Sequence, residues 1–213
     1  MKITNIQLNN FKRFTALTIS NIPASARLVL VVGPNGSGKS SLFDAFYQWY
    51  RGNSGWGYSG EKAYFVKDAG KSLNWSEDVK ITTSDGSRPK RGSLYIRTAY
   101  RNDPDFSVNG INRPESPVET QQFTRLIEND QTVSTNYQRL VYSTMSAVYD
   151  DNNDTKSVLT LRNELIGHVK KSMQNVFGDL ELNNISDPLG VGAFYFKKGE
   201  ALSYHYKNLS GGE

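Results

Sequence analysis

One short segment of the sequence carries residues whose types and spacing suit phosphate chemistry. Residues 33–40 read Gly-Pro-Asn-Gly-Ser-Gly-Lys-Ser and satisfy the pattern G-x-x-x-x-G-K-[ST]. Glycines let the backbone curl so that its N–H groups point at a phosphate, and the positive end of a following helix adds to the attraction. In this pattern Lys39 reaches the β- and γ-phosphates, while the Ser40 hydroxyl ligates Mg²⁺. The predicted contacts to ATP in this P-loop are Asn35, Gly36, Ser37, Gly38, Lys39, Ser40 and Ser41.

The segments on either side of the loop have the patterns that a P-loop requires. Residues 28–32, Leu-Val-Leu-Val-Val, form a continuous apolar run typical of a strand buried on both faces. After the loop, apolar side chains recur at helical spacing, and Gly52 is a helix stop signal. The apolar face of this predicted helix comprises Leu42, Phe43, Phe46, Trp49 and Tyr50.

The remaining sequence predicts several short strands and a helical stretch. Alternating patterns around a polar turn predict a hairpin from residues 3–8 and 17–19. Further strands are expected at 64–66, 79–82, 94–98, 179–183, 191–197 and 201–206, the last two paired as a hairpin. Helical spacing occurs around 123–127, 137–148 and 158–177, with a polar break at 150–154.

Composition excludes several classes of site. The chain has 213 residues, a net charge of +4 and no cysteine, which excludes disulfides, zinc–thiolate sites and cysteine nucleophiles. Its longest purely apolar run, residues 28–32, is far too short to span a bilayer. The histidines His168 and His205 have no third ligand nearby in the sequence, which argues against a metal site or a hydrolase triad. We expect a cytoplasmic protein without a membrane partner.

A basic cluster interleaved with aromatic residues follows the predicted strand at 79–82. Basic groups bind phosphate backbones and aromatic rings stack on bases, so the cluster could contact DNA. The other interpretation is an ordinary solvated strand edge. The cluster comprises Arg88, Lys90, Arg91, Arg97 and Arg101, with Tyr95 and Tyr100 between them.

Three segments together resemble a known family. Residues 3–14, ending in Asn-Phe-Lys-Arg-Phe, resemble the start of SMC, RecF and OLD-type ATPases, and so does the P-loop variant Gly-Pro-Asn-Gly-Ser-Gly-Lys-Ser-Ser. Residues 209–213, Leu-Ser-Gly-Gly-Glu, resemble the ABC signature motif; its glutamate ending is more usual in the SMC-like branch than in transporters. The chain is thus similar to the ABC-type ATPase heads of the SMC/RecF/OLD-like group.

This resemblance implies a fold and a division of the chain. The implied fold is α/β: a P-loop NTPase with an ABC-ATPase-like mixed sheet, an antiparallel β layer and an inserted helical lobe. Residues 1–213 would be an incomplete ATPase domain, with the core and β layer at 1–119, the helical lobe at 120–178 and a hairpin leading to the signature at 179–213.

The resemblance also implies roles for particular residues. Ser210, Gly211 and Gly212 would contact the γ-phosphate bound to the P-loop of a second head. Lys12 and Arg13 would lie near the base, ribose or α-phosphate, unless they are plain surface charges. A glutamine that bridges Mg²⁺ and the helical lobe is also expected. Gln138 is the first choice, with Gln121, Gln122 and Gln131 as rivals.

The implied function is an ATP-driven switch. ATP would join two heads into a homodimer or higher oligomer and control work on DNA, in bacterial antiphage defence with an effector such as a nuclease. The alternatives are a DNA repair or recombination ATPase, the nucleotide-binding subunit of an ABC transporter, and a non-hydrolysing regulatory module. The Asp-Glu pair that the family carries after its signature (Walker B) is absent. Ala-Val-Tyr-Asp-Asp at 147–151 superficially resembles this pattern, but it precedes the signature and lies on a helical stripe, so we do not assign it this role. We therefore expect the chain to bind ATP but to hydrolyse it poorly or not at all.

Overall fold

The computed structural model describes residues 1–98, 106–108, 110, 112–120, 123–128, 132–187, 192–200 and 202–209. The chain divides into two compact units: Met1–Asn102 with Ser116–Asp130, and Asp103–Glu115 with Gln131–Glu213. Within the described ranges, no helix is both long and apolar enough to cross a membrane. The predicted boundaries at 119/120 and 178/179 stay predictions.

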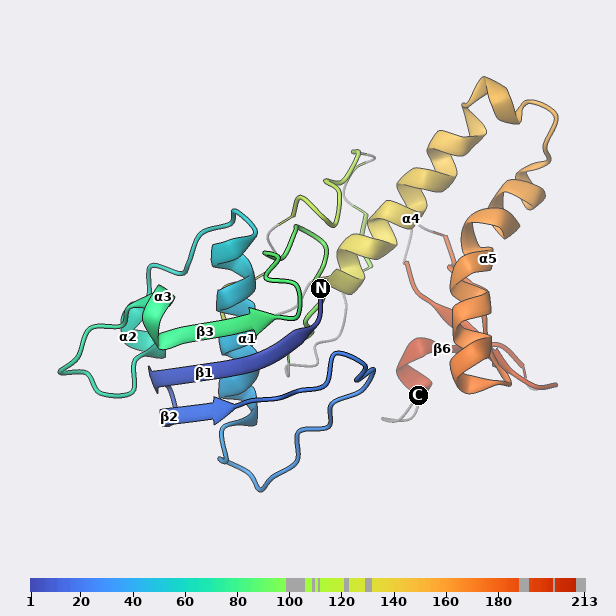
Figure 1. The fold of residues 1–213 in the computed structure, drawn as a ribbon. Helices are drawn as coiled ribbons and strands as arrows, with labels where there is room; N and C mark the ends of the chain where they lie inside the picture. The colour runs from blue at the N-terminus through green and yellow to red at the C-terminus, as the bar shows by residue number, and fades with distance from the viewer. Residues whose placement is uncertain are drawn as a thin grey trace. The chain divides into compact units, whose positions relative to one another are not determined.

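The first unit is built on a three-stranded antiparallel sheet. Its strands are β1 (Ile3–Phe11), β2 (Phe14–Ile19) and β3 (Val79–Thr83), in the order β2-β1-β3 (Figure 1). Ile6 is paired with both Ile19 and Ile81, so each strand places an isoleucine at the same level of the sheet. The predicted hairpin and the predicted strand at 79–82 are confirmed.

One helix covers a face of this sheet. Helix α1 (Lys39–Asn53) crosses behind the strands in Figure 1 and contacts β1 and β3. Two single-turn helices, α2 (Lys62–Phe65) and α3 (Trp75–Asp78), close one end of the core. The predicted helix after the loop is confirmed, although Phe43 is exposed. Helix α1 also buries polar side chains beside its apolar ones, among them Asp44 and Gln48.

The predicted buried strand at residues 28–32 is wrong. These residues belong to neither sheet, and Leu28, Leu30 and Val32 are 85%, 77% and 80% exposed. An apolar run favours burial, but a strand also needs neighbours for its backbone N–H and C=O groups. No strand of the described residues pairs with this segment, so apolar character alone does not make it a strand.

Three other local predictions are also wrong. Residues 62–65 form helix α2, and only Val66 bridges to Phe11. Residues 94–98 are unpaired, and 123–128 are bends and turns in which Phe123 and Leu126 are nevertheless buried. Their apolar side chains fill the core, and packing of this kind does not require regular secondary structure.

The second unit combines a helical hairpin with another small sheet. Helix α4 (Thr132–Val148) is followed by a 3₁₀ turn, η1 (Asp151–Asn153), and by α5 (Val158–Phe177), whose first turn is capped by Ser157 through the N–H of Thr160. Strands β4 (Leu180–Asn184), β5 (Tyr195–Lys198) and β6 (Tyr204–His205) form an antiparallel sheet in that order, and η2 (Tyr206–Asn208) follows. The helices predicted at 137–148 and 158–177 and the terminal hairpin are confirmed.

Both sheets of the described residues are therefore antiparallel, within an α/β chain. The mixed sheet and the ABC-like placement of a helical lobe stay predictions. Several predicted site residues fall outside the described residues: Gln121, Gln122, Gln131, Ser210, Gly211 and Gly212, together with Tyr100 and Arg101 of the basic cluster.

Candidate nucleotide-binding site

The loop at residues 33–40 curls into the start of α1. Gly36 and Gly38 have φ angles of 81° and 103°, a region that side-chain-bearing residues rarely adopt. Gly38 is the N-cap of α1, and no side chain caps the helix there. The first N–H groups of a helix have no partners within it, and they form an anion site at its positive end. The loop therefore has the backbone shape that a phosphate requires.

Lys39 spans this loop. Its Nζ donates to the carbonyl oxygens of Gly33 at 2.7 Å and Pro34 at 2.9 Å. An ammonium group has three N–H donors, so two hold the loop and one remains for a phosphate oxygen. Ser40, next along the helix, is exposed. Its hydroxyl oxygen is the ligand that the P-loop pattern assigns to a bound Mg²⁺.

The turn between β1 and β2 lies against the loop. Arg13 Nε donates to the carbonyl of Gly36 at 3.0 Å, and the guanidinium is exposed beside it. The ring of Phe14 lies so close to Gly38 that an added Cβ would stand 2.7 Å from the ring. Arg13 is therefore a neighbour of the loop, and its contact with a nucleotide stays a prediction.

Lys12, by contrast, is engaged by α1. Its Nζ lies 2.5 Å from Asp44 Oδ2, donates to the hydroxyl of Tyr64 at 3.0 Å, and stands 4.1 Å from the centre of that ring. The other carboxylate oxygen of Asp44 accepts the N–H of Leu126 at 3.0 Å. Lys12 thus ties the β1–β2 turn to the helix that carries the loop, and its predicted contact with the nucleotide remains untested.

Asp44 and Gln48 are the residues that the sequence patterns missed. Both side chains are buried, although neither belongs to the predicted apolar face; at about 100° per residue they lie on the opposite side of α1. Gln48 Nε2 donates to the carbonyl of Thr124 at 2.7 Å, and its Oε1 accepts the N–H of Ser59 at 3.1 Å. No local sequence pattern marked them as buried, because their partners lie 11 or more positions away in the sequence.

The predicted Mg²⁺ glutamine belongs to the second unit. Gln138 lies on α4, donates to the carbonyl of Ser107 at 3.5 Å, and lines a hollow of about 260 Å³ with Val108 and Tyr142. Its role at a nucleotide stays a prediction.

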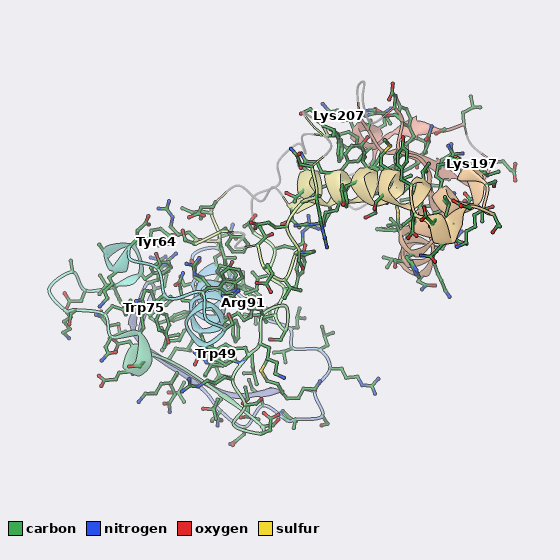
Figure 2. The ribbon with its side chains drawn as sticks, turned by 90° about the horizontal axis from the view of Figure 1, so that it is seen from above. Trp49, Tyr64, Trp75, Arg91, Lys197 and Lys207 are labelled. Carbon is green, nitrogen blue, oxygen red and sulfur yellow. The ribbon has the colours of Figure 1, made fainter. Side chains whose placement is uncertain are left out.

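The basic cluster of the first unit is partly engaged. Arg91, labelled in Figure 2, stacks on Trp56 at 4.0 Å and pairs with Glu119 at 2.7 Å. Arg88, Lys90, Tyr95 and Arg97 are exposed. Contact of this cluster with DNA stays a prediction.

A substitution at Gly38 should damage the loop in two ways. In Gly38→Ala, the methyl group would meet the Phe14 ring and the residue would keep an unfavourable φ. We expect a loss of about 2 kcal/mol in unfolding free energy, with much weaker nucleotide binding, measured by denaturant titration and calorimetry. Gly57→Ala is the matched control, because Gly57 has a φ of 77° but open space around it. Equal losses in both variants would mean that Phe14 does not constrain the loop.

Comparison with known proteins places the chain in a family. A model of the AAA domain matches residues 5–198. The chain is also 44% identical over 54 residues to the chromosome partition protein Smc of Bordetella petrii, a match that covers 25% of this chain and 4% of that protein. No solved structure matches the chain. The family match covers most of the chain and includes the whole loop, so the chain belongs to the AAA domain family, is a P-loop NTPase, and resembles an SMC-like ATPase head.

Proposed function

We propose that this chain is an ATP-binding head whose nucleotide-driven dimerisation controls an activity on DNA. The observation that carries the proposal is the loop geometry: a left-handed Gly38 at an uncapped helix start, with Lys39 drawn across the loop carbonyls. This arrangement offers N–H groups and one ammonium donor to a triphosphate. Ser40 would hold Mg²⁺ at the γ-phosphate side.

The second part of the proposal is that ATP joins two heads. Ser210, Gly211 and Gly212 of one copy would meet the γ-phosphate on the P-loop of the other. A hydroxyl and glycine N–H groups suit a phosphate, and ATP would be the shared ligand between the copies. ATP would then stabilise the dimer by the difference between its binding free energies for the dimer and for the monomer.

The DNA-directed part draws on the similarity to Smc, which is named for chromosome partition. The exposed basic residues of the first unit supply a surface of the required charge: Arg88, Lys90, Arg91 and Arg97. We propose bacterial antiphage defence as the setting and a nuclease as the effector, on the resemblance of the motifs to compact members of the SMC/RecF/OLD-like group.

The test is ATP-dependent association, measured by light scattering with Mg²⁺ and a slowly hydrolysed ATP analogue. The wild-type protein should double its mass when the analogue is added. Ser210→Arg should bind the analogue equally well and remain a monomer, because the arginine would obstruct the γ-phosphate contact between copies. If the analogue binds but the wild-type mass stays constant, residues 210–212 are an ordinary loop and the dimerisation proposal is wrong.

A further inference from the structure

A hollow in the second unit is lined by positively charged and amide side chains. It is lined by residues of α5 and β4, which pack against each other, and we call it the α5–β4 hollow. Its volume is about 230 Å³. Its lining comprises Arg162, Asn163, Ile166 and Lys170 of α5 with Asn183 and Asn184 of β4. No carboxylate is among these residues.

Neither cation of the hollow forms an ion pair with another of the residues that the structure describes. Among the ion pairs of the described residues, none includes Arg162 or Lys170. Glu164, the acidic residue nearest to Arg162 in the sequence, is paired with Lys156 at 2.8 Å. Arg162 and Lys170 are eight positions apart on α5, which is a rise of about 12 Å, so one small anion between them can contact both long side chains.

The amide groups add hydrogen-bond donors. Asn184 Oδ1 accepts a hydrogen bond from the N–H of Ile185 at 2.8 Å. The NH₂ group of the same side chain supplies hydrogen-bond donors. Asn163 and Asn183 are exposed at the rim. The floor is Ile166, which is only 6% exposed. Arginine, lysine and amide donors over an apolar floor suit a tetrahedral oxyanion that carries several acceptor oxygens.

The size of the hollow restricts the ligand. Sites for drug-sized molecules occupy roughly 300–1,000 Å³, and this hollow is smaller. It suits a phosphate group better than a whole nucleotide. We propose that the α5–β4 hollow binds a phosphate group, as a free phosphorylated molecule or as one phosphate of a nucleic-acid backbone. This site is independent of the P-loop and of the function proposed above.

The test uses the full chain in a Lys39→Ala background, so that phosphate at the P-loop does not contribute. Inorganic phosphate is titrated while the backbone amide NMR signals of Asn183 and Asn184 are followed. Saturable shifts are expected. The double variant Arg162→Gln/Lys170→Gln should weaken phosphate binding by about tenfold for each lost charge-assisted bond. The single variant Arg162→Gln should show part of that loss, and it replaces the double variant in the test if the double variant folds poorly.

Lys171→Gln is the matched control, because it removes one exposed charge from the next position on α5 without touching the lining of the hollow. It should leave phosphate binding unchanged. A short single-stranded oligonucleotide that displaces phosphate would assign the site to a nucleic-acid backbone, and failure to displace it would assign the site to a free phosphorylated molecule. Absence of saturable shifts, or an equal loss in Lys171→Gln, would overturn the proposal.

Discussion

Lys39→Ala is expected to abolish detectable ATP binding while the fold stays intact. The lysine contributes a charge-assisted bond to the phosphates, and its loss should weaken affinity on the order of 100-fold. The substitution also removes the two hydrogen bonds that Nζ donates to the carbonyls of Gly33 and Pro34, so the loop loses these internal contacts. These bonds are exposed, so the unfolding free energy should fall by no more than about 1 kcal/mol.

Calorimetric titration with ATP and Mg²⁺ measures the affinity, and circular dichroism with a thermal melt measures the fold. Lys71→Ala is the control, because Lys71 is an exposed lysine of the same unit that pairs only weakly with Asp68 at 3.8 Å. It should bind ATP as the wild type does. Unchanged ATP affinity in Lys39→Ala would refute the assignment of the nucleotide site.

The parts of this site that were predictable from the sequence are those encoded locally. The P-loop pattern fixes the glycine positions, the lysine and the helix that follows, and each interacts with residues a few positions away. Helix α1 therefore begins where the pattern indicates, with Gly38 as its N-cap and Lys39 as its first residue. The β1–β2 hairpin was predictable for the same reason, since alternation and a polar turn are also local signals.

What the sequence could not predict depends on pairing between distant segments. The run at 28–32 has the composition of a buried strand, yet among the described residues it has no neighbouring strand and is exposed. Asp44 lies on the side of α1 opposite the predicted apolar face, but it is buried because Lys12 and Leu126, from distant parts of the sequence, supply its partners. Periodicity reports which side chains are apolar, and it carries no information about such partners.

These distant contacts connect the loop to the sheet. Three consecutive residues, Lys12 and Arg13 of the β1–β2 turn and Phe14 at the start of β2, contact the loop or its helix: Lys12 pairs with Asp44, Arg13 bonds to Gly36, and Phe14 covers Gly38. Lys12 of the turn and Asn10 near the end of β1 both have positive φ, at 48° and 47°. A strained turn of this kind persists when its surroundings hold it in place, and the ion pair between Lys12 and Asp44 of α1 is one such contact.

Asp44→Ala should therefore cost both stability and nucleotide affinity. The carboxylate is almost fully buried, with 2% of its side chain exposed, while the Lys12 side chain is 18% exposed. Removing one partner of a buried pair leaves an uncompensated charge and here also strands the N–H of Leu126. Allowing for the partial exposure of Lys12, we expect a loss of about 2–4 kcal/mol in unfolding free energy, measured by urea denaturation. ATP affinity should fall as well, because the turn that carries Arg13 and Phe14 is no longer fixed to α1.

A double-mutant cycle distinguishes the loss of the ion pair between Lys12 and Asp44 from the loss of side-chain packing. Lys12→Met keeps the length and apolar body of the side chain but removes its charge, so Asp44→Ala in that background leaves no unpaired lysine. The double variant should be more stable than the sum of the two single losses predicts, by a coupling of about 1–3 kcal/mol. Asp68→Ala, which breaks the exposed pair with Lys71, should change stability by less than about 0.5 kcal/mol. Additive losses in the cycle, or equal losses in Asp44→Ala and Asp68→Ala, would show that the ion pair does not hold the turn to the P-loop helix.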